Sequence, residues 1–247
     1  MKSIRFLNLH KLEEILPLFC QVLWALWIAA VAIPTGKSLL IFSLIALLLF
    51  ALMNLVTHFM AKQENHKLST IEFMAVLVLL IAGLIALTSW LTIWLASIML
   101  IFFIAHAYFF NRQPRISRIF YAATWAWIVP LCFAAQHKDI ETTTWLLTLN
   151  TFFWTLTYRN ALALRHNPRI TNLPLLALLY AITFGFLILT GMFSGQGFWY
   201  FIGLIIVLVI FIFQLDLVRK NRAAEAYPYH SLTALLILLG IVLSYRL

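Results

Sequence analysis

Nine apolar runs, of which the last is short and the others are long enough to cross a lipid bilayer, follow one another along this chain with only short polar joints between them. A membrane-spanning helix needs about 20 mostly apolar residues. The joint between the third and fourth runs is only a polar notch in the sequence SWLTIW. We place the nine runs at 15–34, 38–60, 71–90, 91–110, 116–134, 142–164, 173–193, 197–217 and 231–245.

The pattern predicts an all-α, polytopic membrane protein. Hydrophobic residues make up 64% of the chain and charged residues 10%, whereas soluble domains have about 45–50% apolar and 25% charged residues. Polar backbone groups inside the bilayer must bond internally, and long apolar runs achieve this as helices. We therefore expect one transmembrane domain over residues 1–247. Residues 1–14 suit a segment lying in the membrane interface, and a solvated tail fits them equally well.

The basic residues predict the orientation. Lys and Arg in short loops favour the cytoplasmic side, and with nine helices 14 of the 17 basic residues fall on one side. Only Lys37, Lys138 and Arg246 fall on the other side. We therefore expect a cytoplasmic N-terminus and an outer C-terminus, in a bacterial inner membrane. This topology accounts for the net charge of +9 without nucleic acid, and it makes membrane lipids the expected partners.

Polar residues cluster at the predicted cytoplasmic ends of three runs. In the second run, Asn54, His58 and Lys62 are spaced four residues apart and so share one face of a helix. Tyr108 lies near the end of the fourth run. The sixth run ends in a further group, Tyr158, Arg159, Arg165 and His166. We take these residues together as a candidate binding mouth.

The helix count, the orientation and several single residues resemble the UbiA-type intramembrane prenyltransferases, which attach isoprenoid chains to aromatic rings. The matching residues are Tyr108, Trp127, Pro130, Trp154, Tyr158, Trp199 and Gln214. The resemblance covers most of the chain and implies a UbiA-like helical bundle. It also implies a site near the cytoplasmic surface, where aspartates of the family hold magnesium on an isoprenoid diphosphate.

Both aspartate motifs of the family have lost their acids here. Aligned on Asn54, the three aspartate positions of the first motif are occupied by Leu55, His58 and Lys62. Aligned on Trp154 and Tyr158, the aspartates of the second motif become Arg159 and His166. Magnesium binds through carboxylates, so we expect no metal, no cofactor and no transferase activity of the family's kind.

The acids that remain are few. The chain has eight Asp and Glu residues, and Asp139 and Glu141 fall on the predicted outer side. Asp216, near the inner end of the eighth run, is a candidate ion-pair partner for Arg159 or Arg165. Three histidines, His58, His106 and His166, are a second conceivable metal set, but their spacing does not indicate a zinc site.

Arg and Lys pair well with phosphate, so the basic mouth favours an anion held without metal. Our leading hypothesis is a non-catalytic UbiA-like protein that binds an anionic lipid or an isoprenoid-phosphate-like ligand there, or that supports the cell envelope. Ordinary positive-inside residues without a ligand explain the same charges. Two more functions fit the same fold: a divergent prenyltransferase, and a small-molecule transporter or efflux protein, which would open on both faces.

Overall fold

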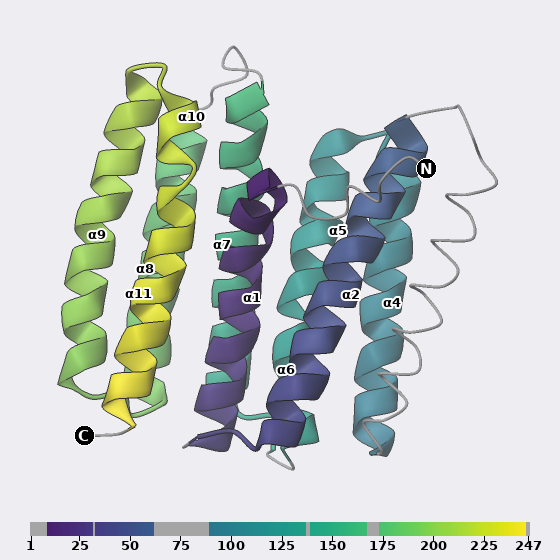
Figure 1. Cartoon of the computed structure of the whole chain (residues 1–247), viewed down its shortest axis with the longest axis vertical. Helices are drawn as coiled ribbons and strands as arrows, with labels where there is room; N and C mark the ends of the chain where they lie inside the picture. The colour runs from purple at the N-terminus through teal and green to yellow at the C-terminus, as the bar shows by residue number, and fades with distance from the viewer. Residues whose placement is uncertain (1–8, 32, 62–88, 137–138, 167–172, 246–247) are drawn as a thin grey trace.

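Helices make up all the regular secondary structure in the residues that the structure, a computed structural model, describes. These residues are 9–31, 33–61, 89–136, 139–166 and 173–245. The helices run up and down as a bundle (Figure 1). Their bounds are α1 (Leu9–Ala30), α2 (Gly36–Ala61), α4 (Trp90–Phe109), α5 (Pro114–Ala126), α6 (Ile128–Ala135), α7 (Thr142–His166), α8 (Leu173–Phe193), α9 (Phe198–Arg219), α10 (Ala223–Ala226) and α11 (Tyr229–Ser244).

The predicted all-α membrane fold is confirmed. Six helical stretches in the described part of the chain are long and apolar enough to cross a membrane. The third predicted run, 71–90, lies almost wholly outside the described residues. The joint after it is a helix start, because the Ser89 hydroxyl accepts a hydrogen bond from the Thr92 backbone N–H at 3.2 Å and so caps α4. The chain is therefore an integral membrane protein.

The fifth predicted run is a bent helix. It is divided at Trp127 into α5 and α6, three residues before Pro130. A proline inside a helix removes one hydrogen bond and its ring clashes with the carbonyl four residues earlier, which here belongs to Ala126. The break therefore lies where the sequence places it. Of the predicted interfacial segment, residues 1–14, the structure describes only residues 9–14, which form the start of α1. Residues 1–8 lie outside the described part of the chain.

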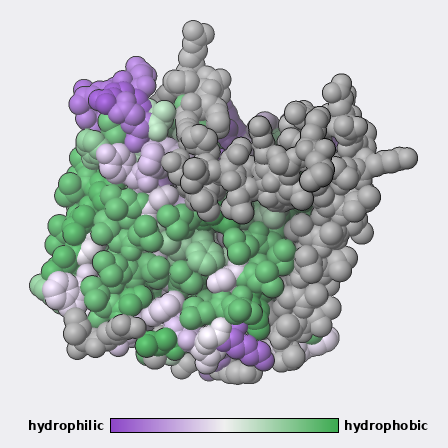
Figure 2. All heavy atoms as spheres, in the orientation of Figure 1, coloured by the Kyte–Doolittle hydropathy of each residue, from purple (hydrophilic) through white to green (hydrophobic). Residues whose placement is uncertain are grey.

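Charge divides between the two ends of the bundle. On the face shown in Figure 2, hydrophobic residues cover the middle of the described part of the chain, and the strongly hydrophilic residues gather above and below them. The end of α2, the α4–α5 connection, the end of α7 and the α9–α10 connection share the upper end in Figure 1. We call this the basic end, because these elements carry Arg112, Arg115, Arg118, Arg159, Arg219, Lys220 and Arg222. The opposite end carries Lys37, Asp139 and Glu141.

Helix α7 lies inside the bundle and packs against α1, α5, α6, α8 and α10. Its Trp154 is 1% exposed and meets the ring of Trp24 edge to face, with the ring centroids 5.3 Å apart. Trp24 in turn donates a hydrogen bond from Nε1 to the Ala234 carbonyl oxygen of α11 at 3.2 Å. These contacts join α1, α7 and α11 at the middle of the bundle.

Gly191 of α8 lies directly against the Tyr200 ring of α9. A Cβ atom added there would lie 2.3 Å from Cε1 of Tyr200, well inside van der Waals contact. The Tyr200 ring cannot move away freely, because it is 1% exposed and its hydroxyl donates to the Leu187 carbonyl oxygen at 2.8 Å. Gly191 is therefore required by packing, as small residues often are between membrane helices.

We expect Gly191→Ala to lower the free energy of unfolding by about 1–3 kcal/mol, since the added methyl group overpacks the α8–α9 contact. The matched control is Gly185→Ala on the same helix, where a Cβ atom would meet nothing within 4 Å. The gain in helix propensity is the same for both variants, so their difference isolates the clash. Thermal unfolding in one detergent measures it, and equal midpoints for the two variants would contradict the packing assignment.

Candidate functional site

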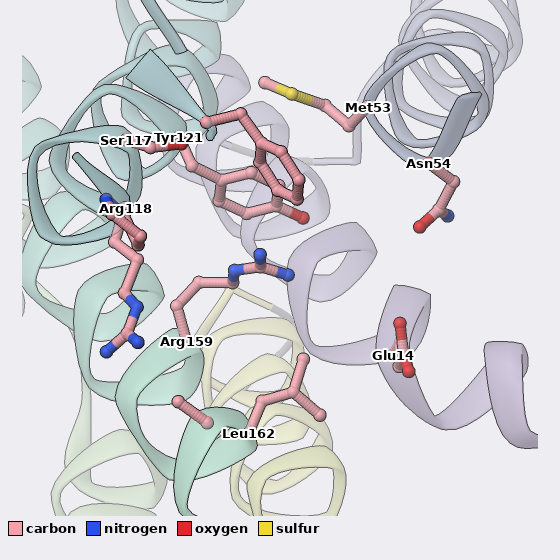
Figure 3. A pocket seen from close by; sticks show the side chains of 11 residues that line it. Glu14, Met53, Asn54, Ser117, Arg118, Tyr121, Arg159 and Leu162 are labelled. Carbon is pink, nitrogen blue, oxygen red and sulfur yellow. The ribbon is translucent and has the colours of Figure 1, made fainter. Parts of the chain in front are cut away.

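A cavity of about 480 Å³ opens at the basic end of the bundle. It lies between α1, α2, α5 and α7, beside the connection from α4 to α5 (Figure 3). Its volume falls within the range of about 300–1,000 Å³ typical of small-molecule sites. The lining residues are Glu14, Met53, Asn54, Phe110, Pro114, Ser117, Arg118, Tyr121, Arg159, Leu162 and Ala163.

Arg159 is the cation that faces the middle of this cavity. It extends from α7 with its guanidinium under the ring of Tyr121, and its Cζ atom lies 4.3 Å from the ring centroid (Figure 3). A guanidinium over an aromatic face is attracted by the ring quadrupole and is held in place by it. The side chain is half-buried. Arg159 therefore presents a fixed charge to anything that enters.

Arg118, the second cation of the lining, is directed elsewhere. Its Nη1 donates to Oδ1 of Asn160 on α7 at 3.0 Å, and Figure 3 shows its guanidinium turned away from that of Arg159. The nearby Ser117 is engaged with His106 on α4, whose Nδ1 lies 2.9 Å from the Ser117 carbonyl oxygen and 2.8 Å from its hydroxyl. These contacts join α4, α5 and α7 into one wall.

The facing wall carries the acid and the amide. Glu14 extends from α1 and Asn54 from α2, across the cavity from Arg159 (Figure 3). Glu14 is half-buried, and Met53 beside Asn54 adds an apolar surface. The cavity therefore has charges of opposite sign on its two walls.

The structure brings together two of the residues that we predicted for the mouth, Asn54 and Arg159. Tyr108 does not line the cavity: it is 53% exposed, and the Arg112 guanidinium lies 4.1 Å from its ring centroid. Lys62 lies outside the described residues. The side chains of His58, Arg165 and His166 lie outside the described part of the chain as well.

Tyr158 faces away from the cavity and does not line it. Consecutive residues of a helix point about 100° apart, so Tyr158 and Arg159 cannot share a direction. The Tyr158 hydroxyl donates to the Glu14 backbone carbonyl oxygen at 2.9 Å and is hydrogen-bonded to the Tyr227 hydroxyl. Tyr158 therefore supports the α1 wall from behind.

Asp216 has a different partner from the one that we expected. It pairs with Lys220 one turn along α9, with Oδ2 and Nζ 2.5 Å apart, and both side chains are exposed. Glu225, which follows α9, pairs with Arg222. The hydrogen bond from Arg222 to Glu225 raises the pKa of Arg222. Among the described residues no ion pair joins Asp216 to Arg159, because a partner four residues away on the same helix is nearer.

Sequence reasoning missed Glu14, Ser117, Arg118 and Tyr121 as parts of one site. Arg118 and Tyr121 are three residues apart at the start of α5 and so share a helix face, a signal that was present in the sequence. Glu14 gave no such signal, because only the packing of α1 against α7 and α2 places it near Arg159.

The donors of this cavity do not suit the magnesium ion that the family resemblance implies. Mg²⁺ is usually bound by carboxylates together with substrate phosphates. The described lining offers one carboxylate, Glu14, one carboxamide, Asn54, and two guanidinium groups. The described residues also contain no group of three or more His, Cys, Asp or Glu side chains placed to hold a metal.

Comparison with known proteins places this geometry in a family. Residues 66–237 match the model of the UbiA prenyltransferase family. The 4-hydroxybenzoate octaprenyltransferase of Aeromonas salmonicida is 24% identical over all of this chain and 97% of its own length. The enzyme of the same name from Aromatoleum aromaticum is 26% identical over 98% of this chain and 93% of its own.

A solved structure of a digeranylgeranylglyceryl phosphate synthase has the same fold, with a TM-score of 0.69 over 96% of each chain at 12% identity. The match to the family model covers well over half of the chain. This chain therefore belongs to the UbiA prenyltransferase family.

Proposed function

We propose that this member of the family binds a phosphate-headed amphiphile in the cavity and does not transfer a prenyl group. The observation that supports this is Arg159, a fixed guanidinium at the position where the resemblance implies an aspartate of the second motif. A guanidinium binds phosphate oxygens directly through paired N–H donors and so needs no bridging metal. The resulting anion site is opposite in sign to a carboxylate site for magnesium.

The apolar part of the lining suits the tail of such a ligand. Met53, Phe110 and Leu162 border the cavity beside the polar groups. A phosphate head at Arg159 would leave its hydrocarbon chain against these side chains and against the hydrophobic surface of the bundle. In this proposal membrane lipids are the partners, and the whole chain acts as one transmembrane domain.

We further propose nine transmembrane helices, with the N-terminus in the cytoplasm and the C-terminus outside a bacterial inner membrane. The basic end carries most of the described Lys and Arg residues, and the opposite end carries Lys37, Asp139 and Glu141. Positive residues in short loops are retained in the cytoplasm, so the cavity would open on that side.

A divergent prenyltransferase is the second candidate function. It is favoured by the relatives named as octaprenyltransferases, which match this chain along nearly its whole length. Transport is less well supported. A second cavity of about 190 Å³ lies at the opposite end, but along α1 the edge-to-face pair of Trp24 and Trp154 lies between the two cavities.

We expect the purified protein to give no magnesium-dependent transfer of a prenyl group from a prenyl diphosphate to 4-hydroxybenzoate, because the described lining lacks paired carboxylates. Product is measured by chromatography, with the Aeromonas relative in the same detergent as the positive control. Product that disappears when a chelator is added would contradict the proposal and favour the divergent transferase.

We expect Arg159→Gln to lower retention of phosphate-headed lipids on the order of 10- to 100-fold, which corresponds to the loss of one hydrogen bond to a charged group. Native mass spectrometry of protein released from lipid mixtures measures this, with and without chelator. Retention by the wild type should be independent of metal and should fall as salt rises. The control is Arg115→Gln, at the same end but outside the cavity lining. Equal retention of phosphate-headed lipids by Arg159→Gln and Arg115→Gln would contradict the proposed anion site.

Reporter fusions test the topology. A phosphatase that is active only in the periplasm should be inactive when fused after Arg169 and active when fused after Leu247. A control fusion after Lys138, predicted to be outside, should be active. The reverse pattern would overturn the proposed orientation and move the cavity to the outer face.

A further inference from the structure

The cavity at the basic end carries a carboxylate as well as a guanidinium, and the two stand on opposite walls. Arg159 extends from α7 under the Tyr121 ring, and Glu14 extends from α1 on the other side (Figure 3). A site for a purely anionic head has no use for this carboxylate, which would repel such a head. The presence of Glu14 therefore favours a ligand whose head carries a positive group as well as a negative one.

Glu14 and Arg159 do not neutralise each other. The ion pairs found in the described part of the chain join Lys220 to Asp216 and Arg222 to Glu225, and neither includes Glu14 or Arg159. Arg118 donates to Asn160 and is turned away, so it does not neutralise Glu14 either. Among the described side chains, therefore, no ion-pair partner occupies either charge of the cavity.

Neighbouring side chains hold the Arg159 guanidinium and the backbone of Glu14. The Tyr121 ring holds the Arg159 guanidinium, with Cζ 4.3 Å from the ring centroid. The backbone of Glu14 is held by the hydrogen bond from the Tyr158 hydroxyl to its carbonyl oxygen, at 2.9 Å. A site with opposite charges on facing walls is complementary to a ligand that carries both signs.

We propose that the ligand is an aminophospholipid with a phosphoethanolamine-type head, whose phosphate binds Arg159 and whose primary ammonium group binds Glu14. This inference rests on the proposed function and narrows the class of ligand from anionic to zwitterionic head groups. The ammonium group supplies N–H donors for the Glu14 carboxylate. The apolar lining at Met53, Phe110 and Leu162 favours a lipid over the free head group.

The test uses the full-length protein in micelles that contain equal amounts of phosphatidylethanolamine and phosphatidylglycerol with identical acyl chains. Native mass spectrometry counts the lipids retained. The wild type should retain phosphatidylethanolamine roughly 3- to 5-fold better than phosphatidylglycerol, a ratio that corresponds to one partly exposed ion pair. Phosphatidylcholine, whose quaternary ammonium has no N–H donor, should be retained less well than phosphatidylethanolamine.

Variants assign the preference to Glu14. Glu14→Gln should abolish the preference by lowering retention of phosphatidylethanolamine to about that of phosphatidylglycerol, and Glu14→Asp should keep the preference. The matched control is Glu141→Gln, an exposed acid at the opposite end, which should behave as the wild type. Thermal unfolding of each variant confirms that it is folded, and the comparison of lipids on the wild type does not depend on any variant.

The outcomes separate this inference from the proposed function. If Arg159→Gln lowers retention of both lipids but Glu14→Gln changes neither ratio nor amount, the zwitterionic inference is wrong and the anion site stands. If Arg159→Gln changes nothing, the proposed function fails and the inference fails with it. Displacement of the lipid by soluble glycerophosphoethanolamine at equal concentration would overturn the assignment to a lipid and point to a free phosphate ester.

Discussion

The architecture depends on keeping a polar helix away from lipid. Helix α7, the sixth predicted run, carries Asn150, Thr151 and Thr155, which are all buried, and it is more polar than the six stretches that are apolar enough by composition to cross a membrane. A polar group facing hydrocarbon would lose its hydrogen bonds to water without replacement. Neighbouring helices surround α7, and the Thr155 hydroxyl donates to Oε1 of Gln21 on α1 at 3.2 Å, whereas the buried side chains of Asn150 and Thr151 have no hydrogen-bond partner among the described residues.

The cavity is a consequence of this central position. Since α7 is enclosed at mid-height, its polar end at Arg159 emerges between α1, α2 and α5 rather than into lipid. The same end is joined to α1 and α10 by Tyr158, which bonds to the Glu14 carbonyl oxygen and to the Tyr227 hydroxyl. Around it, His230 and Tyr180 stack and share a hydrogen bond of 3.1 Å. A rigid aromatic layer therefore supports the wall opposite α5.

Membership of the UbiA family and the chemistry of the cavity point in different directions. The fold and the whole-length matches are those of a family whose relatives are named as prenyltransferases. The described lining instead provides two guanidinium groups and a single carboxylate. Fold does not determine function, because the function depends on the residues of the site.

The sequence by itself determined the helices and their approximate ends, because hydrocarbon thickness requires apolar runs of a fixed length. Through the resemblance it also predicted Asn54 and Arg159 for one mouth, and both of them line the cavity. Only the tertiary structure decided which polar groups face each other: Glu14 across from Arg159, Tyr158 turned to Tyr227, and Asp216 paired with Lys220. The physical reason is rotation, since one step along a helix turns a side chain by about 100°, and hydropathy places residues by depth and not by direction.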